Sequence, residues 1–174
     1  MPERYPPAPG RAAAASGTPD PSVYSVLARF FIYGALGWCL EVLFTGVSAV
    51  IFERDRAATG KTYLWMLPIY GATALLLERL HDAMSAPLIV RALVYLLVIY
   101  LAELSTGWAL RRLLGRCPWD YTGRGLNFRG LIRFDYAPAW FLVALLFEPV
   151  RRLVGDFANS PAARELATKV LSLG

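Results

Sequence analysis

The sequence predicts an all-α polytopic membrane protein, built as a small bundle of about four transmembrane helices. Phe30–Phe52 is 23 residues long with Glu41 as its only charged residue, and Ala92–Leu110 repeats the pattern with Glu103. A helix of 23 residues is about 35 Å long and exceeds the bilayer hydrocarbon core of about 30 Å. The composition agrees, because 56% of the 174 residues are hydrophobic, against about 45–50% apolar residues in average soluble domains.

The chain divides into a transmembrane domain over residues 22–154 and two tails. The first tail, residues 1–21, is rich in Pro, Ala and Gly, and we expect it to be disordered. It lacks the basic start and short apolar core of a signal peptide. In the second tail, residues 155–174, Ser160 and Pro161 fit a helix cap and first turn. A short interfacial helix and a frayed end are both open there.

Each span is set by the limits of an apolar stretch. The four expected spans are Tyr24–Phe52, Thr62–Leu80, Leu88–Leu113 and Leu131–Leu153. Pro68 removes a backbone hydrogen bond from the second span and predicts a kink there. The fourth span is charge-free only over Tyr136–Phe147 and contains Pro138. It is therefore either a tilted span or a re-entrant helix.

The charged residues suit a membrane surface better than a nucleic acid. The formal net charge is +5, which favours contact with lipid phosphates, and no basic motif lies away from the membrane flanks. The 18 Lys and Arg residues divide evenly between the two sides of a four-span topology, so the positive-inside rule does not decide the orientation. The two cysteines, Cys39 and Cys117, do not indicate a disulfide framework.

Three of the expected helices carry a carboxylate beside small residues. Gly37 and Glu41 lie on one face of the first helix, and Glu103 and Gly107 repeat this i, i+4 spacing in the third. Small residues let a second helix approach closely. We therefore expect these faces to meet inside the bundle, with Glu41 and Glu103 close together. The expected residues of this buried polar site are Glu41, Glu103, Tyr70, Glu78, Trp38 and Trp108.

A carboxylate near the bilayer centre costs about 2.5–3.5 kcal/mol on insertion scales, so both glutamates need compensation. Arg111 is about 12 Å along the helix from Glu103, and Arg29 is about 18 Å from Glu41. Protonation, a bound cation, water and hydrogen bonds from hydroxyl groups are the alternatives. The site is then either a place for a proton, ion or ligand, or a protonated glutamate that only joins helices by hydrogen bonds.

The connection between the third and fourth spans is the second candidate site. Trp and Tyr suit the headgroup layer, and Arg binds phosphate bidentately. We expect this connection to lie at the membrane surface and contact anionic headgroups, with an anchoring loop without ligand as the alternative. Its expected residues are Arg112, Arg116, Trp119, Asp120, Tyr121, Asn127 and Arg129.

Other signals in the sequence are weak. Gly60-Lys61-Thr62 resembles the end of a phosphate-binding loop, but Asp55 stands where the first glycine is required. Glu78, His81 and Asp82 share a helix face, yet the chain has a single histidine, and a solvated helix end explains them better than a metal. The sequence therefore indicates no cofactor and no metal.

Four strings together resemble a bacterial family labelled putative type IV ABC-transporter membrane proteins. They are Gly37-Trp38-Cys39-Leu40-Glu41, Pro68-Ile69-Tyr70-Gly71, Glu103-Leu104-Ser105-Thr106-Gly107-Trp108 and Trp119-Asp120-Tyr121. The chain resembles the vertebrate transmembrane protein 229 family more closely still, through Cys39–Thr45, Cys117–Tyr121 and the Tyr136–Phe141 segment. Both resemblances imply a small multi-span membrane protein without supplying a reaction. Pro118 stands where bacterial relatives often have a second tryptophan.

These observations favour a multi-pass protein of the bacterial inner membrane that binds or lets through a small ligand, ion or lipid at its carboxylate-lined interior. The alternatives are an intramembrane lipid-modifying enzyme, with Glu41 or Glu103 as general acid or base, and a structural subunit of a membrane complex. The sequence shows no convincing nucleophile or metal cluster, which disfavours the enzyme. The expected partners are membrane lipids, further copies of the chain or other membrane subunits, and four short helices favour an oligomer for any permeation.

Overall fold

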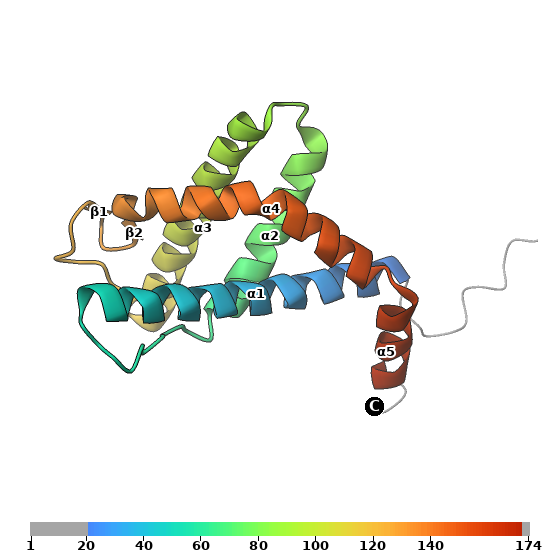
Figure 1. Cartoon of the computed structure of the whole chain (residues 1–174), viewed down its shortest axis with the longest axis horizontal. Helices are drawn as coiled ribbons and strands as arrows, with labels where there is room; N and C mark the ends of the chain where they lie inside the picture. The colour runs from blue at the N-terminus through green and yellow to red at the C-terminus, as the bar shows by residue number, and fades with distance from the viewer. Residues whose placement is uncertain (1–20, 172–174) are drawn as a thin grey trace, which may run out of the picture.

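The computed structural model describes residues 21–171, and this part of the chain is mostly helical (Figure 1). The expected disorder of residues 1–21 falls almost entirely outside the described residues. The elements in chain order are α1 (Pro21–Phe52), α2 (Met66–Ala83), α3 (Leu88–Leu114), β1 (Asn127–Phe128), β2 (Ile132–Arg133), the 3-10 turn η1 (Phe134–Tyr136), α4 (Ala137–Ala158) and α5 (Pro161–Leu171).

Two of the helices, α1 and α3, are long and apolar enough to cross a membrane. Their apolar segments are Val23–Phe52 and Leu88–Leu114. Large apolar side chains along both helices are exposed, among them Leu43, Leu97 and Leu101. An exposed apolar surface of this extent suits lipid contact rather than water. The fold class is therefore helical, with two candidate membrane-spanning helices.

Figure 1 shows α1 and α4 as two long helices running in opposite directions, with α2 and α3 crossing them steeply. The antiparallel order is visible in two contacts. Ser25 near the start of α1 donates a hydrogen bond to Asn159 just after α4 at 3.0 Å, and Phe44 late in α1 contacts the Tyr136 ring just before α4. The α2–α3 pair forms a hairpin joined by residues 84–87.

Glycines bring α1 and α2 very close together. A Cβ at Gly71 of α2 would lie 2.6 Å from the Phe30 carbonyl oxygen, and one at Gly34 of α1 would lie 2.7 Å from the Leu67 carbonyl oxygen. A Cβ at Gly37 would lie 2.5 Å from the Tyr70 ring. The expectation that small residues allow a close helix approach is met at this crossing, and it places Tyr70 against the Glu41 face of α1.

Two expected spans begin later than the apolar pattern suggests. The second starts at Met66 rather than Thr62, so Pro68 lies in the first turn of α2. The kink predicted at Pro68 is wrong, because the first-turn N–H groups have no intrahelical partner for proline to remove. The fourth starts at Ala137, since residues 132–136 form β2 and η1. Pro138 occupies the first turn of α4, and the proline inside this helix is Pro149.

The buried side chains form two clusters at different levels of the bundle. The larger includes Phe147, whose ring contacts those of Tyr33 and Tyr95. The smaller gathers residues from α2, α3 and the following connection, namely Met66, Leu110, Cys117, Trp119 and Leu131. The second cluster draws the 115–136 connection against the helices, beside the candidate site.

A short helix, α5, follows α4. The Ala163 N–H donates to the Ser160 Oγ at 3.2 Å, which is the side-chain cap that the Ser160-Pro161 pair predicts. Leu166 is exposed. Whether α5 lies on a membrane surface stays a prediction.

Candidate functional site

Glu41 has polar neighbours from two elements that pack against α1. The Thr62 hydroxyl donates to Glu41 Oε2 at 2.5 Å, and the Tyr70 hydroxyl of α2 lies near this carboxylate. Thr62 belongs to the α1–α2 connection, which folds back along α1. The Lys61 N–H donates to Thr45 Oγ1 at 2.8 Å and holds the connection in place. The connection therefore supplies a side chain to the site, which the helical pattern of the sequence did not reveal.

Glu103 lies at the matching position on α3. Its residue is 8% exposed, and the Tyr121 hydroxyl donates to Glu103 Oε1 at 3.2 Å. Tyr121 comes from the α3–α4 connection, so a second connection also folds back into the bundle. Glu103 Oε2 is buried and has no hydrogen-bond partner among the described residues. A buried polar atom without a hydrogen-bond partner lowers the stability of the fold unless another group, a water molecule or an ion binds to it.

Glu41 and Glu103 are near enough for their charges to influence each other, and the charges of both act on Tyr70. In the part of the chain that the structure describes, no basic side chain forms an ion pair with either glutamate. We call Glu41, Thr62, Tyr70, Glu103 and Tyr121 the carboxylate cluster. It combines two acids with three hydroxyl groups and lacks a cationic partner among the described residues.

The two tryptophans expected at this site lie in different surroundings. Trp38 is partly buried against the smaller core cluster, and its Nε1 donates to the Tyr63 carbonyl at 3.0 Å. Trp38 therefore supports the α1–α2 connection near the site. Trp108 is 53% exposed, and the Arg112 guanidinium lies 5.2 Å from the centre of its ring. Trp108 lies on the face of α3 opposite Glu103, so its side chain does not reach the interior of the bundle.

Glu78 belongs to a different polar region from the carboxylate cluster. It is 5% exposed, pairs with Arg29 at 2.6 Å and accepts a hydrogen bond from the Tyr33 hydroxyl at 2.7 Å. Glu78 is two turns beyond Tyr70 on α2, about 12 Å along the axis. The expectation that all three helix carboxylates face one another is therefore wrong for Glu78, whose partner is an arginine at the other end of α1.

Two further ion pairs and a hydrogen bond, together with Arg29–Glu78, join all four long helices. Arg91 of α3 binds Glu148 of α4 through two bonds of 2.7 and 2.9 Å. His81 of α2 lies 2.7 Å from the Tyr95 hydroxyl, and Arg151 pairs with Asp82. We call these pairs, together with Arg29–Glu78, the ion-pair layer. Sequence reasoning missed Arg91, Glu148 and Arg151, although each is a charge near an end of an apolar stretch.

The α3–α4 connection folds differently from the surface loop that the sequence suggests. Trp119 is 5% exposed, and its Nε1 donates to the Leu131 carbonyl at 3.1 Å. A Cβ at Gly107 would lie 3.1 Å from the Trp119 ring, so α3 presents its small residue to the indole. Trp119 is thus buried against the bundle and Tyr121 donates to Glu103, and the expectation that both lie in the headgroup layer stays a prediction.

Asp120 has a local structural role in this connection. It accepts hydrogen bonds from the Thr122 N–H at 2.9 Å and the Thr122 hydroxyl at 2.6 Å. These bonds hold the pKa of Asp120 below its usual value. Gly130 has a φ of 70°, and a Cβ there would lie 2.6 Å from Asp120 Oδ1. The turn therefore needs glycine at position 130, and Asn127 closes it by accepting from the Gly130 N–H at 3.0 Å.

Burial raises the pKa of two other groups in the connection. Desolvation, followed by the negative charge of Glu103, raises the pKa of the Tyr121 phenol. Desolvation also raises the pKa of the Cys117 thiol. Tyr121 therefore stays a hydrogen-bond donor at neutral pH, and Cys117 stays a thiol rather than a nucleophilic thiolate. The remaining expected loop residues, Arg112, Arg116 and Arg129, are exposed.

Comparison with known protein families gives a match. The family model described as putative ABC-transporter type IV matches residues 28–170. This range contains the whole carboxylate cluster, the ion-pair layer and both connections. No solved structure matches the chain.

Proposed function

The chain belongs to the putative ABC-transporter type IV family, and from this premise we propose an integral membrane protein in which α1–α4 all cross the bilayer. Helix α2 has 18 residues and α4 has 22, so they are about 27 and 33 Å long. These lengths approach the hydrocarbon core of about 30 Å. The bacterial inner membrane is the proposed location. The closer likeness to the transmembrane protein 229 family is part of the proposal and rests on the strings quoted above.

We further propose that the carboxylate cluster binds one small positive charge, either a proton or a monovalent cation. The observation that carries this is the pair Glu41 and Glu103, which has hydroxyl donors and no ion-pairing basic side chain among the described residues. Two negative charges in a water-poor interior repel each other and are costly to desolvate. A bound positive charge near Glu103 Oε2, the unpaired oxygen, removes both costs.

The ion-pair layer supports this assignment by contrast. Its acids Glu78 and Glu148 already have arginine partners within 3 Å. Such pairs need no further cation and fix the helices relative to one another. The chain thus places compensated charges at one level of the bundle and uncompensated charges at another. The uncompensated level suits binding or permeation, and further copies of the chain or other membrane subunits would complete a path across the bilayer.

The binding role predicts an infrared signature. In the purified full chain at pH 7, with choline as the only salt cation, we expect a protonated-carboxyl band. It should disappear in Glu103→Gln or Glu41→Gln. If a cation takes the place of the proton, sodium or potassium chloride should reduce the band in the wild type. Asp82→Asn in the exposed part of the ion-pair layer is the control and should leave the band unchanged.

A different spectrum would contradict the binding of a positive charge by the carboxylate cluster. A wild-type spectrum with no protonated-carboxyl band and no response to sodium or potassium would mean that the two carboxylates need no positive charge. The cluster would then act only through its hydrogen bonds, which fits a structural subunit. Turnover of a lipid substrate that is lost in both glutamine variants would instead favour the lipid-modifying enzyme.

We also propose that the α3–α4 connection contacts membrane lipids. Exposed arginines at positions 116 and 129 lie in the same connection as Leu126 and Phe128, which are 70% and 43% exposed. Arginine beside exposed apolar side chains suits a headgroup layer, where each basic residue contributes about 1 kcal/mol. The buried Trp119 and the half-buried Tyr121 attach the connection to the bundle.

Arg116→Gln with Arg129→Gln is therefore expected to weaken binding to anionic vesicles while leaving binding to neutral vesicles unchanged. The change follows from the loss of two charges at the surface, about 2 kcal/mol in all at low salt, and added salt should mask it. Vesicle flotation or nanodisc exchange measures the preference. Equal lipid preference in the wild type and the double variant would leave the loop arginines with a role in topology alone.

A further inference from the structure

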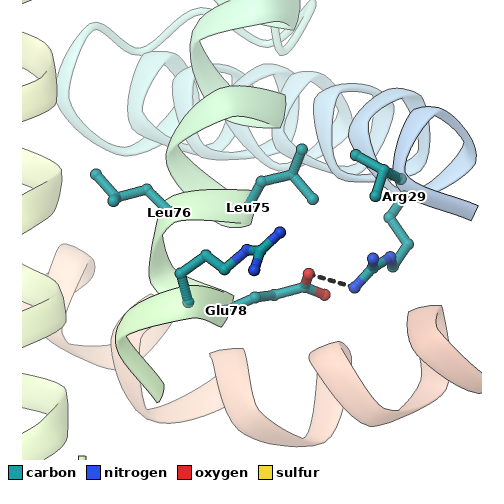
Figure 2. Close-up of a pocket in the computed structure, with 6 residues that line it drawn as sticks. Arg29, Leu75, Leu76 and Glu78 are labelled. Carbon is teal, nitrogen blue, oxygen red and sulfur yellow. Dashed lines mark hydrogen bonds and ion pairs between the residues drawn. The ribbon is translucent and has the colours of Figure 1, made fainter. Parts of the chain in front are cut away.

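A pocket between α1 and α2 lies apart from the carboxylate cluster and from the α3–α4 connection. It has a volume of about 210 Å³ and is lined by Val26, Arg29, Leu75, Leu76, Glu78 and Arg79. Figure 2 shows Arg29 and Glu78 joined by their ion pair, with Leu75 and Leu76 on the neighbouring turn of α2. Two guanidinium groups and one carboxylate therefore border an otherwise apolar hollow.

The charges of this pocket are only partly compensated. Glu78 Oε2 accepts from Arg29, and Glu78 Oε1 accepts from Tyr33, so both of its oxygens are occupied. Arg79 is exposed and has no ion-pair or hydrogen-bond partner among the described residues. Two arginines against one glutamate leave one positive charge at the pocket. An anion is the ligand that this balance favours, and a guanidinium binds phosphate oxygens through two parallel hydrogen bonds.

The position of the pocket fits the headgroup layer of a membrane. Arg29 directly precedes the apolar stretch that starts at Phe30, and Arg79 lies two residues after Leu77, where the apolar part of α2 ends. Basic residues at the end of a span lie near lipid phosphates. Leu76 is 50% exposed, and Leu27, the residue that follows Val26 in α1, is also 50% exposed. These apolar side chains lie where the chains of a bound lipid would continue.

The size of the pocket limits what it can hold. Sites that enclose a whole small molecule usually measure about 300–1,000 Å³, and this hollow is smaller. A phosphate group with its first carbon atoms fits a space of this kind when the rest of the ligand lies along the apolar outer surface. We propose that the pocket binds the phosphodiester headgroup of an anionic phospholipid, with Arg79 as the main phosphate ligand and Arg29 as a second donor.

This proposal is independent of the carboxylate cluster and is tested on the full chain. The test is native mass spectrometry of the detergent-solubilised protein titrated with phosphatidylglycerol or phosphatidylcholine. Wild type should retain phosphatidylglycerol more strongly. Arg79→Gln should weaken this binding about fivefold, the fold-change that corresponds to about 1 kcal/mol for one arginine at a membrane surface. Phosphatidylcholine has the same phosphate, but its choline ammonium opposes the positive pocket, so it should bind more weakly and lose less in Arg79→Gln. Arg79→Lys should recover part of the loss of phosphatidylglycerol.

Arg152→Gln is the matched control, because Arg152 is an exposed arginine on α4 beside the Arg151–Asp82 pair. It removes the same charge at the same end of the bundle and should keep wild-type binding. Equal losses in Arg79→Gln and Arg152→Gln would overturn the pocket, since general surface charge would then explain the preference. Glycerol phosphate in solution is the second arm. Full displacement of phosphatidylglycerol by millimolar glycerol phosphate would assign the site to a soluble phosphate ester and reject the lipid.

Discussion

Gly71→Ala should destabilise the bundle more than any other single methyl addition at the α1–α2 crossing. The new Cβ would lie 2.6 Å from the Phe30 carbonyl oxygen and 2.9 Å from its ring. A backbone carbonyl inside a helix cannot rotate away, so the two helices must separate. Overpacking of this kind costs about 1–3 kcal/mol of the free energy of unfolding. Thermal unfolding in detergent, followed by circular dichroism, measures the loss.

Gly155→Ala is the matched control for this prediction. Gly155 lies within α4, and a Cβ there would meet nothing within 4 Å. Alanine in a helix interior is favoured over glycine by about 0.5–1 kcal/mol, so this variant should melt at the wild-type temperature or slightly higher. Equal melting temperatures for Gly71→Ala and Gly155→Ala would show that α1 and α2 are not in backbone contact. A separated crossing would also move Tyr70 away from Glu41 and weaken the carboxylate cluster.

Glu78→Gln should give the second large effect. The substitution removes the negative charge that Arg29 binds at 2.6 Å and changes the acceptor of the buried Tyr33 hydroxyl. Breaking a buried ion pair costs about 3–5 kcal/mol. The Arg29 side chain is 26% exposed, so water relieves part of this penalty. We expect a loss of about 1–3 kcal/mol, typical of a damaged charged hydrogen bond.

The exposed Asp82–Arg151 pair of the ion-pair layer tests whether buried contacts or overall charge stabilise the bundle. Asp82 pairs with Arg151, but its side chain is 61% exposed, and exposed pairs contribute about 0–1 kcal/mol. Asp82→Asn should therefore change the melting temperature much less than Glu78→Gln. A similar drop in both variants would mean that the layer acts through overall charge balance rather than through the buried Glu78 contacts. The same measurement in high salt provides a check, because salt screens the exposed pair more strongly.

The positions of the two longest helices could be predicted from the sequence because a helix that crosses a bilayer needs a continuous apolar stretch of a known length. Apolar stretches of about 20 residues have few stable alternatives to a helix in lipid. The expected first and third spans therefore agree with α1 and α3 to within a few residues. The apolar stretches predict the ends of the shorter helices less accurately. Their apolar stretches extend into connections at Thr62 and Leu131, where side chains pack inward without being helical.

The pairing of Glu41 with Glu103 is a prediction that the sequence makes by itself. Each is the only charge in its apolar stretch, and small residues beside each allow the helices to meet. Thr62 and Tyr121, the hydroxyl donors from the connections, were not predictable as part of this site. Nothing in a local pattern shows that a loop folds back into the bundle, since that depends on tight contacts such as the one between Trp119 and Gly107.

By itself, the sequence determined the helical class, the two longest apolar helices and the pair of isolated carboxylates. The tertiary structure decided which charges have partners. Arg29 meets Glu78 over a separation of 49 residues, and Arg91 meets Glu148 over 57. The physical reason is that hydrophobicity acts along each segment, so one stretch of sequence reveals it. Ion pairing depends on which helix ends come within about 4 Å of each other, and only the packed bundle sets that distance.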